Sequence, residues 1–284
     1  MLLAPFLIFF VLTFLLPIFI AIGSSFTKVT RSGLFGEKGV TTSFAGFSNY
    51  AAALGDANFI ASIGRMFLFG IVQVPVMLIF CTVLALLLES ASAKWPGFFR
   101  AAYFLPYGVP GVIATILWSF LYVPGLSPLF DVAKVVGFTP DFLGSGSVLW
   151  SIANIVTWSY TGYNMLIIVA QLKSIPVEIY EAAKVDGASP LRVATSIQLP
   201  LIRPALLLTA VFSIIGTLQL FAEAQVLQKV APAVDSQYTP NLSAYTTAFA
   251  YNDYNVAAAQ AVLIALVAFA LSVVFLKVTN RKQS

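Results

Sequence analysis

The segment EAAKVDGASPLRVATSIQLP, Glu181–Pro200, is a polar stretch between two hydrophobic ones. The chain has 284 residues, of which 60% are hydrophobic and 9% are charged, and its mean hydropathy is +0.93. A water-facing globule carries far more charge than this, so the composition predicts an integral membrane protein. The polar segment is therefore expected to lie outside the bilayer and to connect two membrane spans.

Local signals predict the shape of this segment. Residues 176–186 are expected to form a short helix with acidic side chains near its start, where the helix dipole favours them. Gly187 can adopt the positive φ that ends a helix. Ser189 is a good N-cap, and Pro190 suits the first position of a following helix. We expect two short helices bent at Gly187 and anchored at both ends by spans, which together would act as a lever.

A transmembrane helix needs about 20 mostly apolar residues. Backbone groups in lipid must satisfy their own hydrogen bonds, and long apolar runs without period-2 alternation are helices rather than barrel strands. The sequence therefore predicts an all-α membrane protein with six transmembrane helices in a single domain, residues 1–284. The expected spans are about Leu2–Ile22, Ile60–Leu88, Ala101–Val123, Val148–Leu172, Pro204–Phe221 and Val256–Leu276, with the polar connecting loop at 173–203.

The distribution of Lys and Arg predicts the orientation, because cytoplasmic loops carry an excess of them. With both termini in the cytoplasm, nine basic residues face inward: Lys94, Arg100, Lys173, Lys184, Arg192, Arg203, Lys277, Arg281 and Lys282. Five face outward: Lys28, Arg31, Lys38, Lys134 and Lys229. Arg65 lies near the mouth of the second span and is not assigned to either side. The basic residues form no run, which argues against nucleic acid as a partner.

The first span has a second interpretation. Ala21-Ile22-Gly23 offers small residues at a plausible cleavage site for a signal peptide. No basic residue precedes the apolar run, however, and its length suits a span, so a retained helix is favoured.

Several chemistries are excluded by composition. The chain has no histidine and a single cysteine, Cys81, inside an apolar run, so zinc sites, disulfides and cysteine–histidine pairs are not expected. An intramembrane protease is excluded on similar grounds, because no serine–histidine dyad can form and no G-x-G-D motif occurs. The glycine-rich stretch 33–39 lacks the spacing of a phosphate-binding loop, so the chain is not expected to hydrolyse ATP.

The distribution of acids bears on the energy source. An ion-driven secondary carrier usually keeps ionisable residues within the bilayer. Here Glu89 and Glu223 lie at the edges of predicted spans, and the span centres are almost free of charge. The sequence therefore favours energy supplied by another protein, with an ion-coupled carrier as the less favoured alternative.

The polar segment resembles the cytoplasmic EAA loop of permease subunits from ABC importers that work with a binding protein. The matching residues are Glu181, Ala182, Ala183, Asp186, Gly187, Ala188, Ile197, Leu199 and Pro200. The resemblance implies the type I ABC importer permease fold and a role for the loop in coupling to the ATPase. We add Arg192 to the expected coupling residues. Ala194 stands where many relatives have phenylalanine, so a bulky contact with the ATPase is absent or supplied elsewhere.

The same resemblance implies partners and location. They are a second homologous permease subunit, two cytoplasmic ATPase subunits that hold ATP and magnesium, and an extracytoplasmic binding protein. The chain itself would need no cofactor and no metal. Its place would be the bacterial or archaeal cell membrane, as a multi-pass protein.

Three further stretches narrow the resemblance. Residues 44–50, 100–110 and 158–166 are similar to carbohydrate importers of the maltose type, and more so to the first of their two permease subunits. At 229–232 the chain departs from the Gly-Gly-Pro turn of many relatives, which bears on how the outer loop would meet the binding protein.

A sugar site in a membrane is expected to combine aromatic faces with neutral hydroxyl and amide groups. Matching onto the maltose-type pattern carries over Tyr107, Tyr163 and Ser213 as sugar contacts, whereas Asn164, Thr217 and Gln219 rest on polarity and spacing. Small polar residues also pack helices together, which is the competing interpretation for Thr157, Ser159 and Thr217.

The sequence thus predicts a permease subunit of an ATP-driven importer for a sugar or oligosaccharide. Glycerol phosphate or another polyol derivative is the alternative cargo. An anionic cargo would prefer basic groups beside the path, and no Lys or Arg lies at the middle of a predicted span, which favours a neutral sugar.

Overall fold

The computed structural model describes residues 3–31, 39–90, 92–135, 137 and 139–280. Leu2 at the start of the first predicted span, the glycine-rich stretch 33–38 with Lys38, and Arg281 and Lys282 lie outside the described residues. The described chain is mostly helical. It divides into two compact units, each discontinuous in sequence. The first comprises 1–66, 218–221 and 235–271, and the second comprises 67–217, 222–234 and 272–284.

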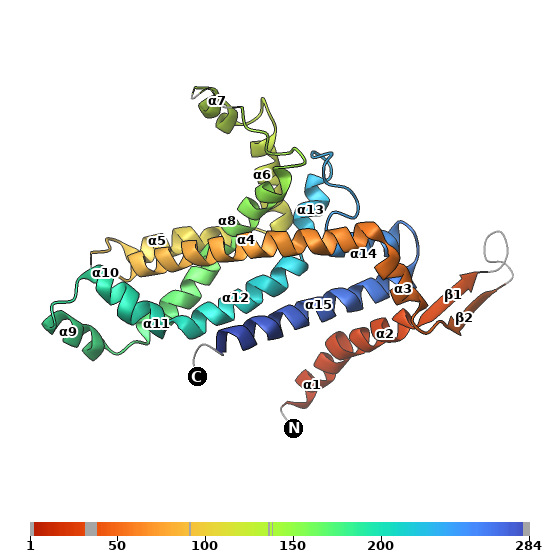
Figure 1. The fold of residues 1–284 in the computed structure, drawn as a ribbon, viewed down its shortest axis with the longest axis horizontal. Coiled ribbons are helices and arrows are strands. Elements are labelled where there is room, and N and C mark those ends of the chain that lie inside the picture. Colours follow the sequence, from red (N-terminus) through yellow and green to blue (C-terminus); the bar gives the residue numbers. More distant parts are fainter. Residues whose placement is uncertain (1–2, 32–38, 91, 136, 138, 281–284) are drawn as a thin grey trace. The chain divides into compact units, whose positions relative to one another are not determined.

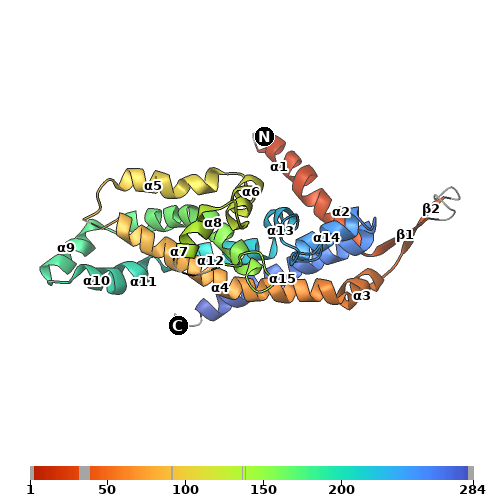
Figure 2. The ribbon, with the colours of Figure 1, turned by 90° about the horizontal axis from the view of Figure 1, so that it is seen from above.

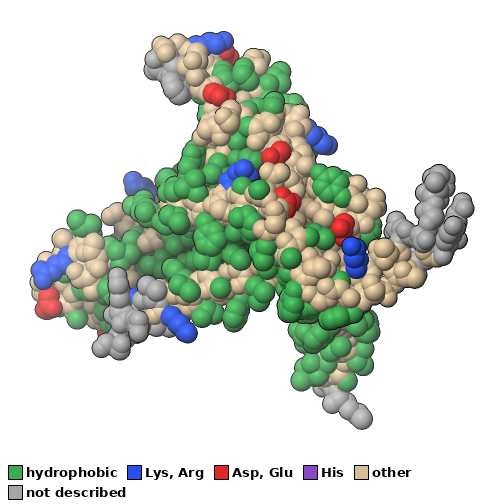
Figure 3. Space-filling view, turned by 45° about the vertical axis from the view of Figure 1, so that its right-hand side comes forward, with side chains coloured by type: hydrophobic (Ala, Val, Ile, Leu, Met, Phe, Trp, Pro, Cys, Tyr) green, Lys and Arg blue, Asp and Glu red, His purple; other side chains and the backbone are tan. Residues whose placement is uncertain are grey.

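The first unit begins with a continuous hydrophobic helix, Ala4–Ser25. It consists of α1 (Ala4–Phe10), a π-helical turn η1 (Val11–Leu15) and α2 (Leu16–Ser25). Nearly all of its large side chains are exposed, and hydrophobic side chains cover much of its visible face in Figure 3. Such a surface is stable only against lipid or another apolar protein.

A β-hairpin follows, in a region that the sequence predicted only as an outer loop. The strands β1 (Thr27–Arg31) and β2 (Val40–Phe44) pair antiparallel, with Thr27 opposite Phe44 and Arg31 opposite Val40 (Figure 1). The β-branched threonine and valine side chains in both strands favour this pairing.

Polar side chains fasten the base of the hairpin within the first unit. Asn49, on α3 (Ser48–Gly55), donates from Nδ2 to the carbonyls of Ser25 (2.8 Å) and Thr27 (2.7 Å). Asn255, at the start of α15 (Tyr254–Asn280), donates from Nδ2 to the Ser24 carbonyl at 2.9 Å. These bonds satisfy backbone acceptors where α2 ends.

Arg65 also has its place within the first unit. It lies on α4 (Ala57–Leu88) and donates from Nη1 to the Tyr238 carbonyl at 2.5 Å. Its guanidinium carbon lies 4.2 Å from the centroid of the Tyr238 ring, a cation–π contact. Tyr238 precedes α14 (Pro240–Phe249), so the pair ties α4 to this segment.

The second unit holds most of the remaining helices (Figures 1 and 2). After α4 they are α5 (Pro96–Phe104), the 3-10 turn η2 (Leu105–Gly108), α6 (Gly111–Tyr122), α7 (Pro128–Val135), α8 (Val148–Lys173), α9 (Val177–Val185), α10 (Pro190–Val193), the π-turn η3 (Ala194–Gln198), α11 (Leu199–Leu201), α12 (Arg203–Leu218) and α13 (Ala222–Leu227).

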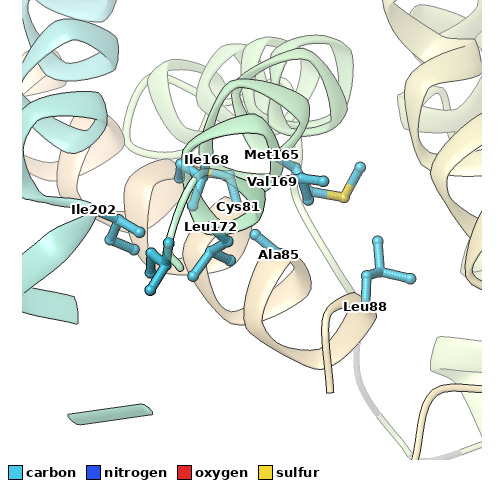
Figure 4. Close-up of a cluster of buried hydrophobic side chains, with 9 residues drawn as sticks. Cys81, Ala85, Leu88, Met165, Ile168, Val169, Leu172 and Ile202 are labelled. Carbon is cyan, nitrogen blue, oxygen red and sulfur yellow. The ribbon is translucent and has the colours of Figure 1, made fainter. Parts of the chain in front are cut away.

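The core of this unit lies where α4 and α8 meet (Figure 4). Cys81 and Ala85 on α4 are fully buried against Met165 and Ile168 on α8, and Ile202 closes the cluster beside α12. Small side chains on α4 permit the close approach that helix packing in membranes requires. This core fixes α8, from which the candidate site projects.

Length and apolar composition mark three helices of the described residues as candidate spans: Ala4–Ser25, Ala57–Leu88 and Tyr254–Lys277. Two bent pairs raise this to five. The pair 96–108 with 111–122 bends by 95°, beside Pro106 and Pro110, and the pair 190–201 with 203–218 bends by 64°. α8 is 26 residues long but does not qualify, because a polar run from Thr157 to Asn164 interrupts its hydrophobic surface.

Candidate functional site

The bend at Gly187 is formed by the end of α9. Gly187 has φ +71°, a conformation that other residues rarely adopt. The Ala188 N–H donates to the Ala183 carbonyl at 2.9 Å, and the Gly187 N–H donates to the Lys184 carbonyl at 3.1 Å. These two bonds are the Schellman motif. The predicted helix end and the positive φ of Gly187 are therefore confirmed.

The second arm of the bend starts as the sequence predicts. Ser189 caps α10 by accepting the Arg192 N–H on its hydroxyl at 3.3 Å, and Pro190 is the first helical residue. The arm continues through η3 and α11. Gln198 donates from Nε2 to the Tyr180 hydroxyl at 3.4 Å, which connects this arm to α9. The two arms form an elbow of residues 177–201, visible in Figures 1 and 2.

The predicted coupling residues differ in exposure. Glu181, Ala182, Asp186, Gly187 and Arg192 are exposed, Ala188 is half-buried, and Ala183 is buried at 6%. Ala183 therefore packs inside the elbow rather than on its surface.

Beside the bend, the elbow exposes two apolar side chains that could not be singled out from the sequence. Val185 is 88% exposed and Leu191 is 74% exposed, one on each side of Gly187. Ala194 is only half-buried in η3, and its small side chain offers little surface. Val185 and Leu191 are the large apolar groups that the bend presents.

A second cluster lies where η2 meets α8. The rings of Tyr107 and Tyr163 stack with centroids 4.5 Å apart and planes at 15°. Tyr160 meets Tyr107 edge-on, with centroids 5.8 Å apart. Tyr107 is 41% exposed and Tyr160 is 43% exposed, so the cluster presents aromatic surface. The structure thus brings together two of the predicted sugar contacts, Tyr107 and Tyr163, with Tyr160 beside them.

Gly162 explains how η2 comes so close to α8. A Cβ on Gly162 would collide with the carbonyl of Tyr103, and it would lie 2.9 Å from the Phe104 amide nitrogen. Only glycine allows this approach of α5 to α8. The backbone contact sets the position from which Tyr107 reaches Tyr163.

The other predicted sugar contacts lie elsewhere. Asn164 is 4% exposed and donates from Nδ2 to the Met77 sulfur at 3.5 Å, on the side of α8 that faces α4. Ser213 and Thr217 donate to backbone carbonyls of their own helix at 2.7 and 2.9 Å, and Thr217 is 6% exposed. Gln219 is exposed and follows the end of α12, in the first unit.

Thr157, the first residue of the polar run on α8, makes a polar contact with a neighbouring helix. Gln73 on α4 donates from Nε2 to the Thr157 hydroxyl at 3.3 Å. This is the inter-helix hydrogen bond that the sequence favours for Gln73. Directly after the end of α4, Glu89 forms an ion pair with Arg100 on α5, and both side chains are mostly buried.

Comparison with known proteins places this geometry in context. Residues 82–284 match the family described as binding-protein-dependent transport system inner membrane component. The chain is 28% identical over 283 residues to a probable starch degradation products transport system permease protein, AmyD, of Thermoanaerobacterium thermosulfurigenes, covering 99% of this chain and 93% of that one. It is 30% identical to the lactose transport system permease protein LacF of Rhizobium radiobacter, covering 84% of this chain and 82% of that one.

The fold has a counterpart of known structure. A chain of a bacterial ABC transporter involved in the import of the acidic polysaccharide alginate superposes with a TM-score of 0.83, covering 99% of this chain and 94% of that one at 20% identity. At this identity the likeness concerns the fold alone, which is that of an ABC importer permease. Because the family match covers most of the sequence, this chain belongs to the family of binding-protein-dependent transport system inner membrane components.

Proposed function

We propose that this chain is the permease subunit of an ATP-driven importer for a sugar or oligosaccharide, in which the elbow at residues 177–201 couples the membrane path to separate ATPase subunits. The main support for this proposal is the exposed bend at Gly187. Each arm beside it presents one charged and one apolar side chain: Asp186 and Val185 on the first arm, and Arg192 and Leu191 on the second. Such a surface is better suited to docking on another protein than to exposure to solvent. It supports the role that the EAA resemblance implies.

The membrane arrangement follows from the helices. Six spans result if the three long hydrophobic helices, the two bent pairs and α8 are each counted once. With both termini in the cytoplasm, the elbow lies on the cytoplasmic side together with Lys173 and Arg203. The helix Ala4–Ser25 is continuous and exposes its apolar side chains, which supports a retained span over a cleaved signal peptide.

The sequence supports separate roles for this chain and for partner ATPase subunits. It lacks a phosphate-binding loop, so ATP and magnesium would be held by two partner ATPase subunits. ATP binding would draw those subunits together and move the elbow with them. The spans would then open outward to receive cargo from an extracytoplasmic binding protein. A second homologous permease would complete the path, because one such subunit lines only half of it.

The aromatic cluster supports sugar as the cargo. Stacked Tyr107 and Tyr163 offer flat faces for the C–H surface of a pyranose ring. The relatives named for starch degradation products and lactose agree with this choice. Ser213, Thr217, Asn164 and Gln219 remain proposed contacts, and the first three would need side-chain rotation to reach a ligand, since their present partners are within the protein. Glycerol phosphate remains the alternative cargo.

Reconstitution tests the proposed function. The chain would be purified with its partner permease, ATPases and binding protein, placed in proteoliposomes, and assayed for ATP hydrolysis and uptake of radiolabelled maltotriose, lactose and sn-glycerol 3-phosphate. The proposal expects a sugar to raise ATP hydrolysis and to accumulate only when ATP is present. Uptake driven by a proton or sodium gradient without the ATPase subunits would instead establish a secondary carrier.

A further inference from the structure

An acidic side chain lies beside the tyrosine cluster. Glu223 is half-buried on α13, a short helix that packs against both α6 and α8 in the second unit. Its Oε1 would lie 4.0 Å from a Cβ on Gly111, the first residue of α6. The packing of α13 on α8 brings the Glu223 carboxylate within electrostatic reach of the Tyr160 phenol. The carboxylate therefore lies near the tyrosine cluster, in which Tyr107 and Tyr160 are exposed and Tyr163 is half-buried.

Glu223 has no cationic partner to explain its position. Across the described residues, the ion pairs are Arg100 with Glu89 and Lys134 with Asp131. A partly buried carboxylate without a cation is costly, and burial raises the pKa of Glu223 while a bond from its own backbone N–H opposes the rise. The first turn of α13 and the nearby start of α6 offset part of this cost through their helix dipoles.

Gly111 leaves the start of α6 without a side chain next to the Glu223 carboxylate. A Cβ at this position would come into van der Waals contact with Oε1. From the side of α8 and η2, the cluster of Tyr107, Tyr160 and Tyr163 contributes phenol groups, which cannot carry a positive charge. Glu223 is thus the group that sets the sign of the charge at this surface.

We propose that Glu223 is the residue by which this subunit selects neutral sugars over anionic ones, an inference that rests on the proposed function. A carboxylate accepts two hydrogen bonds from neighbouring hydroxyl groups of a sugar, and these charge-assisted bonds are stronger than neutral ones. The tyrosine faces cover the apolar side of the same ring. A uronate or a phosphate ester placed there would meet a like charge in surroundings that screen poorly.

This role differs from a capping role for the same side chain. If Glu223 served only α13, replacing it by glutamine would change stability and leave the preference for neutral ligands untouched. If it selects cargo, the preference changes even when the helix is kept. Selectivity between matched neutral and anionic ligands is therefore the informative measurement.

The test is equilibrium binding by isothermal titration to the purified, nucleotide-free complex of permease and ATPase subunits, without the binding protein. The probes are maltotriose and lactose, each with its oxidised acid, maltotrionate and lactobionate. For Glu223→Gln we expect the ratio of acid to neutral dissociation constants to fall at least fivefold, with the neutral sugar bound more weakly. Glu223→Asp, which keeps the charge, should retain the wild-type ratio.

Asp131→Asn is the matched control, since Asp131 lies in the same unit with a side chain that is 81% exposed, and its removal changes the net charge equally. If Glu223→Gln fails to assemble, the same ratio is measured in the wild-type complex over a series of pH values from 7.5 downward, and it should fall as Glu223 becomes protonated. A ratio that stays constant in the assembled variant, or across pH when the variant fails to assemble, overturns the role of Glu223 while leaving sugar transport intact. Absence of any sugar binding and of sugar-stimulated ATP hydrolysis would overturn the proposed function itself.

Discussion

The backbone carbonyl of Tyr103 lies directly against Gly162, where no larger residue fits. Because this contact holds α5 against α8, it determines where η2 places Tyr107. The aromatic cluster thus depends on one glycine in the middle of α8. Its geometry can be tested without touching an aromatic residue.

Gly162→Ala should impair sugar-stimulated ATP hydrolysis although it leaves every tyrosine in place. The new methyl group would force α5 away from α8, at a cost of about 1–3 kcal/mol for an overpacked contact. Thermal melting of the detergent-purified complex and sugar titration would be measured together. Gly64→Ala on α4, where a Cβ would meet nothing within 4 Å, is the control and should behave as wild type. Normal sugar affinity in Gly162→Ala would contradict the positioning role.

Tyr107→Ala should raise the sugar concentration required for half-maximal stimulation by about tenfold, because an aromatic contact contributes about 0.5–1.5 kcal/mol beyond area burial. Tyr107→Phe keeps the stacked ring and should lose much less. Tyr254→Ala, at a tyrosine that is 51% exposed in the first unit, serves as the control. If Tyr107→Ala and Tyr254→Ala were indistinguishable in sugar titrations, the cluster would not be the sugar site.

The ion pair of Glu89 with Arg100 should contribute to stability rather than to cargo binding. Arg100 also has a buried Nε without a hydrogen-bond partner among the described residues, so its charge depends on this pairing. Glu89→Gln should lower the stability of the complex by about 1–3 kcal/mol. The double variant Glu89→Gln with Arg100→Met should recover part of this loss, because no unpaired charge remains. A double variant less stable than either single one would argue against the explanation.

The raised pKa of Glu223 predicts opposite pH trends for two properties. Selectivity for neutral sugar needs the charged carboxylate, so it should be present at high pH and disappear as pH falls through a pKa above the usual 4.5. The contribution of Glu223 to the stability of the fold, in contrast, requires its protonated form. The contribution from Glu223 is complete below the unfolded-state pKa and is lost as pH rises through the folded-state pKa. Binding ratios and melting temperatures of wild type and Glu223→Gln over the same pH series would check both trends, which the variant should lack.

Local chemistry explains what could be predicted from the sequence. The end of α9 at Gly187 and the Ser189 cap follow from a few neighbouring residues, and both occur as expected. The helix predicted at Val148–Leu172 corresponds to α8, Val148–Lys173, because a long apolar run in a membrane protein has few alternatives.

Contacts between distant segments could not be predicted in the same way. The 95° bend between η2 and α6 depends on how Pro106 and Pro110 are held by the rest of the unit. Asn164 follows Tyr163 in sequence but projects to Met77, since successive helical residues lie on different faces. From the sequence, Glu223 could be placed only at the edge of a predicted span. The packing of α13 on α6 and α8 brings it near the tyrosines.

If the elbow transmits force through a rigid bend at Gly187, Gly187→Pro should uncouple ATP hydrolysis from transport. Proline requires φ near −65°, which is incompatible with +71°. Gly125→Pro, at a glycine with φ +82° in the same unit but outside the elbow, is the matched control. The measurement is the ratio of sugar transported to ATP hydrolysed in proteoliposomes. We expect this ratio to collapse for Gly187→Pro in an assembled complex and to persist for Gly125→Pro. Full sugar uptake by assembled Gly187→Pro would show that coupling does not depend on this bend.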